Sequence, residues 1–226
     1  MAKGKLIVID GTDGAGKSTQ TALLVRRLRK DGYSVVAEDF PQYGKKSAGL
    51  VEEYLTGAYG AAKRLGPYIP SIFYAADRFA ASDRIRKNLA AGKIVICNRY
   101  VTANLAHQGG KIVSARKRWE FAKWVTNLEY GLFGIPRPDL NLILHLPAKV
   151  AQELVDNKAA RNYLKGQKRD IHEKDLRHLK AAEKVYLEIA KRFGYPVIGC
   201  YGRGRILSRP EIAERVRSMI KKQLKI

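Results

Sequence analysis

The sequence has few cysteines, few acidic residues and no long apolar run. Its two cysteines among 226 residues, Cys97 and Cys200, are too few for a disulfide framework or a zinc site of their own. Each ends an apolar, strand-like run, so we expect buried free thiols and a cytoplasmic location. A membrane-spanning helix needs about 20 consecutive apolar residues, and the apolar run at residues 6–9 is too short for a signal peptide. We therefore expect neither a membrane span nor a secretion signal.

The shortage of acidic residues leaves a net charge of +22, from 43 lysine and arginine residues against 21 aspartate and glutamate residues. Such an excess is typical of proteins with anionic partners, which include nucleotides, nucleic acids and acidic surfaces. The basic residues are scattered and form no stripe with interleaved aromatic residues, which argues against a nucleic-acid interface.

Residues 11–18 (Gly-Thr-Asp-Gly-Ala-Gly-Lys-Ser) fit the phosphate-binding pattern G-x-x-x-x-G-K-[ST]. An apolar run at residues 5–10 predicts a buried parallel strand before this loop, and residues 19–30 predict a helix after it, ended by Gly32. The glycines allow backbone N–H groups to surround phosphate oxygens at the positive end of a helix dipole. The predicted ATP-binding residues are Gly11, Thr12, Asp13, Gly14, Ala15, Gly16, Lys17, Ser18 and Thr19. Lys17 is expected to reach the β- and γ-phosphates and Ser18 to bind Mg²⁺; a turn that is merely rich in glycine is the alternative.

Strand and helix patterns alternate along the rest of the chain. Strands are predicted at residues 34–38, 93–97, 139–146 and 196–200, and helices at residues 70–91, 102–108 and 116–133. Ser208 and Glu211 predict a capping box for a last helix. We therefore expect one domain over residues 1–226, an α/β fold of the P-loop NTPase type with three layers (α/β/α) and a five-stranded parallel sheet.

Segments that follow the predicted strands carry candidate ligand contacts. Residues 39–44 (Asp-Phe-Pro-Gln-Tyr-Gly) form a shaped loop where open α/β sheets bind ligands, with a hydrophobic plug under a turn as the alternative. Arg99 ends the third strand, where it can hold a phosphate group with two hydrogen bonds. Asn104 and Gln108 lie four residues apart on the next helix, so their amides share a face that can read a base edge. Solvated amides and a structural His107 are the alternatives.

The helix at residues 70–91 is expected to place Ile72, Ala76 and Phe79 in the core. Tyr74 and Arg78, four residues apart, then share the opposite face. An aromatic ring beside a guanidinium can stack on a base and hydrogen-bond its edge. An ordinary surface pair is the alternative.

Residues 158–170 form a basic, glycine-containing segment between two helical patterns. A loop of this kind over a phosphate site can exclude water and neutralise charge during phosphoryl transfer. A solvated basic linker is the alternative. Asp170 and Glu173 follow at the start of a helix, where acidic residues also suit the dipole.

Four signatures together resemble the thymidylate kinase family over nearly the whole chain. They are the Gly-x-Asp-Gly-Ala-Gly-Lys of residues 11–17, the Phe-Pro-x-Tyr-Gly of residues 40–44, the Arg-Tyr pair of residues 99–100, and the acidic pattern of Asp170, Glu173 and Asp175. The resemblance implies a homodimeric P-loop kinase that transfers a phosphoryl group from Mg·ATP to dTMP, giving dTDP. It thus implies Mg²⁺ as cofactor and ATP and dTMP as partners.

The resemblance also implies roles for single residues. Asp13 would contact the 3′-OH region of the acceptor, Phe40 would pack on its sugar, and Arg99 would hold its phosphate. Tyr74 would stack on thymine, and Arg78 and Asn104 would read its edge. Further implied acceptor contacts are Pro41, Tyr43, His107, Gln108, Asp170 and Glu173. The implied metal ligands are Ser18, Asp13 and Asn98, and the implied lid residues are Arg161, Lys165, Lys168 and Arg169, with Arg161 and Arg169 catalytic beside Lys17 and Arg99.

Several positions depart from the family pattern. Asn98 replaces the usual aspartate before the Arg-Tyr pair, Gln42 replaces a frequent arginine, and His107 stands where similar enzymes often carry tyrosine. Tyr74 takes the place of the usual phenylalanine. Gly14 stands where one arrangement of the family has an arginine, so the basic segment resembles the arrangement in which the lid supplies the charge.

Two other functions remain open on the residues alone. One is a kinase for another nucleoside or nucleoside monophosphate. The other is a non-catalytic P-loop protein that binds nucleotides or nucleic acid, which the charge of +22 suggests.

Overall fold

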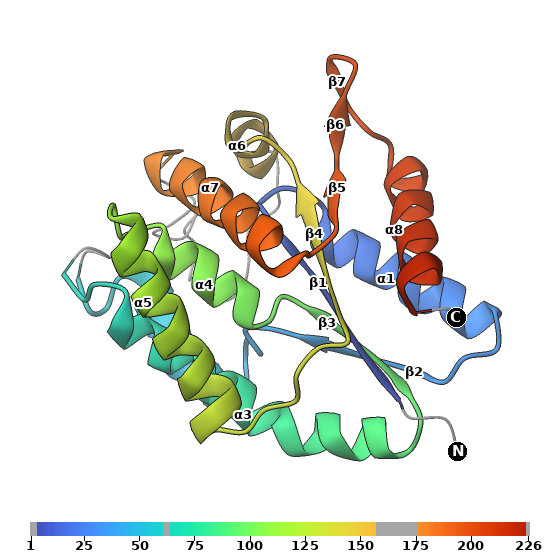
Figure 1. The fold of residues 1–226 in the computed structure, drawn as a ribbon, viewed down its shortest axis with the longest axis horizontal. Helices are drawn as coiled ribbons and strands as arrows, with labels where there is room; N and C mark the ends of the chain where they lie inside the picture. The colour runs from blue at the N-terminus through green and yellow to red at the C-terminus, as the bar shows by residue number, and fades with distance from the viewer. Residues whose placement is uncertain (1–3, 61–63, 157–175, 225–226) are drawn as a thin grey trace.

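A five-stranded sheet lies at the centre of the computed structural model, which describes residues 4–60, 64–156 and 176–224 (Figure 1). Every neighbouring pair of strands is parallel, and the order across the sheet is β2-β3-β1-β4-β5. The strands are β1 (Lys5–Gly11), β2 (Val35–Asp39), β3 (Ile94–Asn98), β4 (Leu140–His145) and β5 (Val197–Gly199). The predicted α/β fold with a five-stranded parallel sheet is confirmed.

Helices cover both faces of this sheet (Figure 1). β1 shows why both faces need cover, because Leu6 and Val8 belong to one apolar cluster whereas Ile7 and Ile9 belong to the other. A strand that is apolar on both sides is typical of the middle of a parallel sheet. One face packs against α1 (Lys17–Lys30) and α8 (Arg209–Leu224), and the other against α3 (Tyr68–Ala90), α4 (Val101–Gly109), α5 (Ala115–Thr126) and α7 (Leu176–Phe193).

The observed elements differ from the predicted ones mainly at their ends. The helix predicted at residues 116–133 is α5 followed by a π-helical turn, η2 (Asn127–Leu132). The predicted capping box is confirmed, since the Ser208 amide donates to the Glu211 carboxylate at 2.7 Å and the Glu211 amide to Ser208 Oγ at 3.4 Å. The helical pattern expected before residue 158 is α6 (Ala148–Asp156). Elements that were not predicted are η1 (Lys46–Ala48), α2 (Gly49–Thr56) and the hairpin of β6 (Tyr201–Gly202) and β7 (Arg205–Ile206).

The predicted core face of α3 is wrong. Ile72 and Phe79 are exposed, whereas Ala75 and Arg78, which was expected on the outer face, are buried. Glu129 neutralises the charge of Arg78 inside the protein. Helical periodicity alone cannot reveal this arrangement, because the partner of Arg78 lies 51 residues away in the sequence.

Two expectations about the whole chain can be compared with the structure. Cys97 and Cys200 are buried free thiols, as predicted. Burial raises the pKa of the Cys200 thiol to about 11, so it stays protonated at neutral pH. Within the described ranges, no helix combines the length and apolar character that a bilayer crossing requires.

The carboxyl ends of three strands meet at one edge of the sheet. Ile9 of β1 lies beside Asn98 of β3, and Asp39 of β2 lies on the other side of Asn98. The loop after β1 therefore lies next to the residues that follow β3. Open α/β sheets bind ligands at this edge.

Candidate active site

The loop after β1 has two positions that exclude any side chain. Gly11 has a φ of 132°, and a Cβ there would lie 2.0 Å from the carbonyl oxygen of Leu144. Gly14 has a φ of 78°, and a Cβ there would lie 2.9 Å from the carbonyl oxygen of Ala151. The glycines of the motif therefore allow both the turn and its close packing against β4 and α6.

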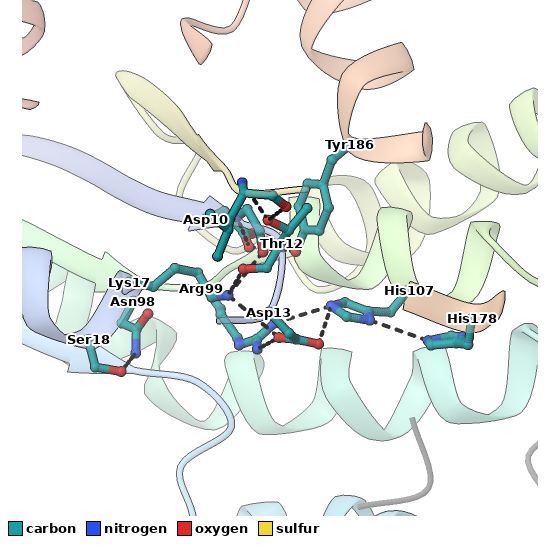
Figure 2. A network of polar contacts seen from close by, with 12 residues as sticks. Asp10, Thr12, Asp13, Lys17, Ser18, Asn98, Arg99, His107, His178 and Tyr186 are labelled. Atoms are coloured by element: carbon teal, nitrogen blue, oxygen red, sulfur yellow. Dashed lines mark hydrogen bonds and ion pairs between the residues drawn. The ribbon is translucent and has the colours of Figure 1, made fainter. Parts of the chain in front are cut away.

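Lys17 begins α1 and lies folded over the loop (Figure 2). Its Nζ donates to the carbonyl oxygens of Gly11 at 3.0 Å and Thr12 at 2.9 Å, and it lies 3.6 Å from Asp13 Oδ1. Thr12 is itself fixed to the end of β4, because its Oγ1 donates to the Leu146 carbonyl at 2.8 Å. The ammonium is thus held at the N-terminus of a helix, the position expected of a lysine that binds phosphate.

Arg99 reaches from the tip of β3 to the phosphate-binding loop. Its backbone has a φ of 65°, an uncommon conformation for a residue with a Cβ, and this turns the side chain toward Asp13. Arg99 Nη2 donates to Asp13 Oδ1. Burial alone would raise the pKa of Asp13, but the Arg99 guanidinium holds it well below the usual value. Asp13 therefore stays ionised and joins Arg99 to Lys17.

His107 lies beside both Arg99 and Asp13 (Figure 2), with its Nε2 3.9 Å from Asp13 Oδ2. Arg99 Nη1 lies 3.2 Å from His107 Nε2, and a guanidinium can only donate, so Nε2 must accept and the proton resides on Nδ1. His107 Nδ1 lies 3.4 Å from His178 Nε2, and the two rings are stacked with centroids 5.6 Å apart. Burial and the positive charge of Arg99 lower the pKa of His107 to about 3. The ring is therefore neutral at physiological pH.

Asp10 lies close to Arg99 and Lys17 and was not predicted as a site residue. It is fully buried, and its carboxylate accepts hydrogen bonds from the Tyr186 hydroxyl at 2.7 Å and the Gly11 amide at 2.9 Å. Burial raises the pKa of Asp10. The signal was a single acidic residue at the end of an otherwise apolar strand, directly before the first glycine of the motif.

Asn98, Ser18 and Asp39 form a separate group of oxygen-bearing side chains. Asn98 Nδ2 donates to Asp39 Oδ1 at 2.7 Å and to Ser18 Oγ at 3.1 Å. Asn98 Oδ1 is buried and has no hydrogen-bond partner among the described residues. Hydroxyl, carboxylate and amide oxygens are the donors that Mg²⁺ accepts, so this group fits a divalent cation. Asp39 was missed because a strand-end residue gives no sign of its neighbour on the next strand.

Arg78 does not form the exposed pair with Tyr74 that the sequence suggested. Its guanidinium is buried and donates through Nε at 2.5 Å and Nη2 at 2.6 Å to the carboxylate of Glu129. Tyr74 is half-buried, and its ring meets the ring of Tyr54 edge to face at 6.4 Å. Glu129 is fully buried and was also missed by the sequence analysis.

Asn104 and Gln108 are both buried on α4 rather than solvated. Asn104 Nδ2 donates to the Ser71 carbonyl and to Glu129 Oε1, each at 3.2 Å. Asn104 Oδ1 and both polar atoms of the Gln108 amide have no hydrogen-bond partner among the described residues. Buried polar atoms without partners are rare in folded proteins, so these atoms are candidates for contact with a ligand.

The loop at residues 40–44 is divided between core and surface. Phe40 is buried, with its ring 5.7 Å from that of Tyr100. Pro41 is half-buried and Tyr43 is exposed. The loop therefore presents Pro41 and Tyr43 outward, while Phe40 anchors it to the core.

Gln42 attaches this loop to α3. Its backbone amide donates to Asp77 Oδ2 at 2.8 Å, and its Oε1 accepts from Arg84 Nη2 at 3.0 Å and from Lys45 Nζ at 2.8 Å. Positive charge is thus present around this position, although Gln42 replaces an arginine that is frequent in the family.

Two groups of predicted site residues lie outside the described residues. They are the lid residues Arg161, Lys165, Lys168 and Arg169 and the acceptor contacts Asp170 and Glu173. The remaining predicted phosphate-loop residues belong to the motif that precedes α1 or to its first turn: Ala15 is buried, Gly16 and Ser18 are exposed, and Thr19 is half-buried.

The fold and this edge of the sheet define a P-loop protein of the three-layer α/β class. A sequence model of the thymidylate kinase family matches residues 9–200, and the chain belongs to this family. It is 32% identical over 186 residues to the thymidylate kinase of Mycobacterium tuberculosis, covering 82% of this chain and 85% of that protein. It is also 30% identical over 218 residues to a probable thymidylate kinase of Pyrobaculum aerophilum, covering 96% of both.

A solved structure of thymidylate kinase from Candida albicans is similar in fold. The TM-score is 0.76, with 98% of this chain and 93% of that chain covered, at 21% sequence identity. This likeness confirms the fold class that the sequence predicted.

Proposed function

We propose that this dTMP kinase transfers the γ-phosphoryl group of ATP to dTMP by bringing two cations, Lys17 and Arg99, to one carboxylate. Asp13 accepts a hydrogen bond from Arg99 and lies 3.6 Å from Lys17 Nζ, and this is the observation that carries the proposal. Lys17 would bind the β- and γ-phosphates of ATP, and Arg99 would bind the phosphate of dTMP. The shared carboxylate holds the two cations close together, so the donor and acceptor phosphates would meet between them.

Transfer of this kind needs positioning and charge stabilisation rather than a covalent intermediate. Lys17 would stabilise negative charge on the equatorial oxygens of the transferring group, and the backbone N–H groups of residues 11–18 would bind the remaining phosphate oxygens. Neutral His107, which accepts from Arg99, helps to keep the Arg99 guanidinium pointed at the acceptor phosphate. Asp13 and Phe40 would contact the acceptor sugar.

The acceptor base would be read by the buried polar groups beside α3 and α4. Thymine presents an N3–H donor, and the unpartnered Asn104 Oδ1 would accept it. Arg78 would donate to a carbonyl oxygen of the base through the guanidinium nitrogen that Glu129 does not use. Tyr74 would stack on the ring, and Gln108 would supply a further amide.

Mg²⁺ would be the cofactor of this ATP-dependent kinase. Ser18, Asn98 and Asp39 would hold it, with phosphate oxygens of ATP completing its ligands. Among the described residues, no three acidic, histidine or cysteine side chains are arranged to hold a metal ion, so the protein alone offers a weak site. When bound, Mg²⁺ neutralises charge on the β- and γ-phosphates.

The basic segment at residues 158–170 would act as a lid within a single domain of residues 1–226. The positive charge that Gly14 cannot supply would come from Arg161, Lys165, Lys168 and Arg169. Neutralising Arg161 and Arg169 should slow transfer and leave dTMP binding in the absence of ATP unchanged; a change in solubility alone would make the segment a solvated linker.

A homodimer would cover an exposed apolar stripe on α3, formed by Ile69, Ile72 and Phe79. These residues recur at helical spacing on one face, and Phe79 is backed by Phe133 at 5.2 Å between ring centroids. An apolar face of this kind favours burial against a second copy of the chain. The cytoplasm, where Cys97 and Cys200 stay reduced, suits this enzyme.

One panel of assays tests the proposed function. ADP formation from ATP is measured with each nucleoside monophosphate and deoxynucleoside monophosphate, with and without single-stranded DNA. We expect turnover with dTMP above all others and no effect of DNA. Preference for another acceptor would make the protein a different nucleotide kinase, and binding without any transfer would make it a non-catalytic P-loop protein.

A further inference from the structure

Glu129 occupies an unusual position beside the acceptor residues. It belongs to the π-helical turn η2 and is fully buried. Its carboxylate accepts three hydrogen bonds, two from Arg78 at 2.5 and 2.6 Å and one from Asn104 at 3.2 Å. π-Helical turns occur frequently at functional sites. One buried carboxylate thus holds the two side chains that would read the base.

Stability is a poor explanation for this buried ion pair. Removing two charges from water is costly, and apolar residues of the same volume often stabilise a core at least as well. Another bidentate arginine–glutamate pair provides a comparison, because Arg118 donates to Glu188 through Nε at 3.2 Å and Nη2 at 3.0 Å. That pair joins α5 to α7 with Glu188 partly exposed. The complete burial of Glu129 therefore indicates a role in orienting its partners.

Glu129 fixes the orientation of the Asn104 amide. Both hydrogens of Asn104 Nδ2 are used, one by Glu129 Oε1 and one by the Ser71 carbonyl. A rotated amide would place Oδ1 against these two acceptors and would lose both hydrogen bonds. Asn104 Oδ1 is consequently the atom left to meet a ligand, and it has no partner among the described residues.

Glu129 also fixes which part of the Arg78 guanidinium is used. Nε and Nη2 bind the carboxylate as a pair, and Nη1 makes no hydrogen bond to the described residues. Arg78 is therefore held as a donor and Asn104 as an acceptor. Thymine matches this pair, because it presents a carbonyl acceptor beside the N3–H donor. Cytosine carries an amino group in place of the O4 carbonyl of thymine and has an unprotonated N3, so a guanidinium facing the 4-position and the Asn104 carbonyl would both be mismatched.

We propose that Glu129 is a positioning residue that sets the preference for thymine over cytosine by locking the Asn104 amide and the Arg78 guanidinium. The inference rests on the proposed function. Glu129 itself makes no contact with the substrate and acts through its two partners.

The test is the selectivity of Glu129→Gln, measured as the ratio of kcat/KM for dTMP to kcat/KM for dCMP. Glutamine removes the charge and adds an amide donor that can face Asn104 Oδ1, so the Asn104 amide can rotate. We expect the ratio to fall by about ten-fold or more. The KM for ATP should stay within about two-fold of the wild-type value, because the phosphate-binding loop is unchanged.

Glu188→Gln is the matched control, since it weakens a bidentate arginine–glutamate pair away from the acceptor residues. We expect it to lower thermal stability and leave the selectivity ratio unchanged. In an Asn104→Ala background, Glu129→Gln should change the ratio less than in the wild-type protein, because one of the two side chains through which Glu129 acts is gone. Glu129→Asp, which keeps the charge but is one methylene shorter, carries the test if Glu129→Gln does not fold. It should also reduce the ratio.

A wild-type selectivity ratio in both Glu129 variants, with only a lower Tm, would overturn the inference. That outcome is distinct from failure of the proposed function, in which the wild-type protein itself would not phosphorylate dTMP.

Discussion

Asn98 donates a 2.7 Å hydrogen bond to Asp39, so an amide and a carboxylate lie side by side at the ends of β3 and β2. The family usually has a carboxylate at position 98. In this chain the negative charge at the strand ends comes instead from the neighbouring strand. Asn98 Oδ1 is then left without a partner among the described residues and can serve as a neutral oxygen ligand.

The first prediction concerns this pair. Asn98→Asp should lower the half-saturating Mg²⁺ concentration, because it adds a charged ligand. The same change sets two carboxylates in contact, so the Mg²⁺-free protein should melt about 2–4 °C lower. Asp39→Asn should raise the half-saturating Mg²⁺. Mg²⁺ titrations at fixed ATP and dTMP, and melting curves with and without Mg²⁺, measure these effects; superimposable titrations of all three proteins would place the pair away from the metal.

The second prediction is that Lys17→Ala abolishes transfer and leaves the fold intact. Lys17 contacts loop carbonyls and Asp13 rather than the apolar core, so its loss should act on transition-state charge. We expect kcat to fall by about 100-fold or more. Lys30→Ala, at the exposed end of the same helix, should keep wild-type kcat and Tm. A Lys17→Ala enzyme that keeps more than about a tenth of wild-type kcat would contradict the assignment.

The phosphate-binding loop could be predicted from the sequence because its residues are contiguous. The alternation of apolar strands and helices likewise predicted the parallel sheet, since the central strands β1, β3 and β4 are apolar on both faces. The side of α3 that faces the core could not be predicted. Arg78 has the pattern of a surface residue, and only Glu129, 51 positions away, makes its burial possible.

The Asn98–Asp39 pair shows the same limit. Asp39 and Asn98 are 59 residues apart and meet only because β2 and β3 are neighbours. Glu129 carried a weak signal as an acidic residue in the aromatic-rich stretch at residues 119–133. Long-range pairs of this kind depend on strand order and helix packing, which local patterns do not specify.

The third prediction is that His107 makes the stability of the protein depend on pH. Its pKa is about 3 in the folded protein, lowered by burial and by Arg99, against about 6.5 in the unfolded chain. Between these values the unfolded state binds one more proton, so stability is fully present above about pH 6.5 and falls as the pH falls toward 3. The slope from this group is about 1.4 kcal/mol per pH unit.

His107→Asn removes the titrating group while keeping polar contacts to Arg99 and His178. We expect a flatter fall of the unfolding free energy between pH 6 and 4 than in the wild-type protein, measured by urea denaturation. Equal slopes for both proteins would mean that His107 is not held neutral by its surroundings.

The fourth prediction is that Tyr74→Ala raises KM for dTMP far more than KM for ATP. Tyr74 is half-buried on α3 one turn before Arg78, and its ring is held edge to face by Tyr54. Loss of base stacking is worth about 1–3 kcal/mol, which corresponds to roughly 5- to 150-fold in dTMP affinity. Tyr74→Phe keeps the ring and should stay near wild type. Steady-state kinetics with each substrate varied separately provide the measurement, and equal effects on both KM values would rule out stacking.

The last prediction is that Phe79→Glu separates the homodimer. Phe79 is exposed at the end of the apolar stripe on α3 with Ile69 and Ile72, and a charge buried there without a partner would oppose association. Sedimentation velocity should show wild-type protein at twice the chain mass of 25.3 kDa and the variant at the mass of one chain. Val113→Glu is the control, because Val113 is 95% exposed and lies off the stripe, so it should leave the dimer intact. A dimeric Phe79→Glu protein would mean that the interface lies elsewhere. A monomeric wild-type protein would mean that no second copy covers the stripe.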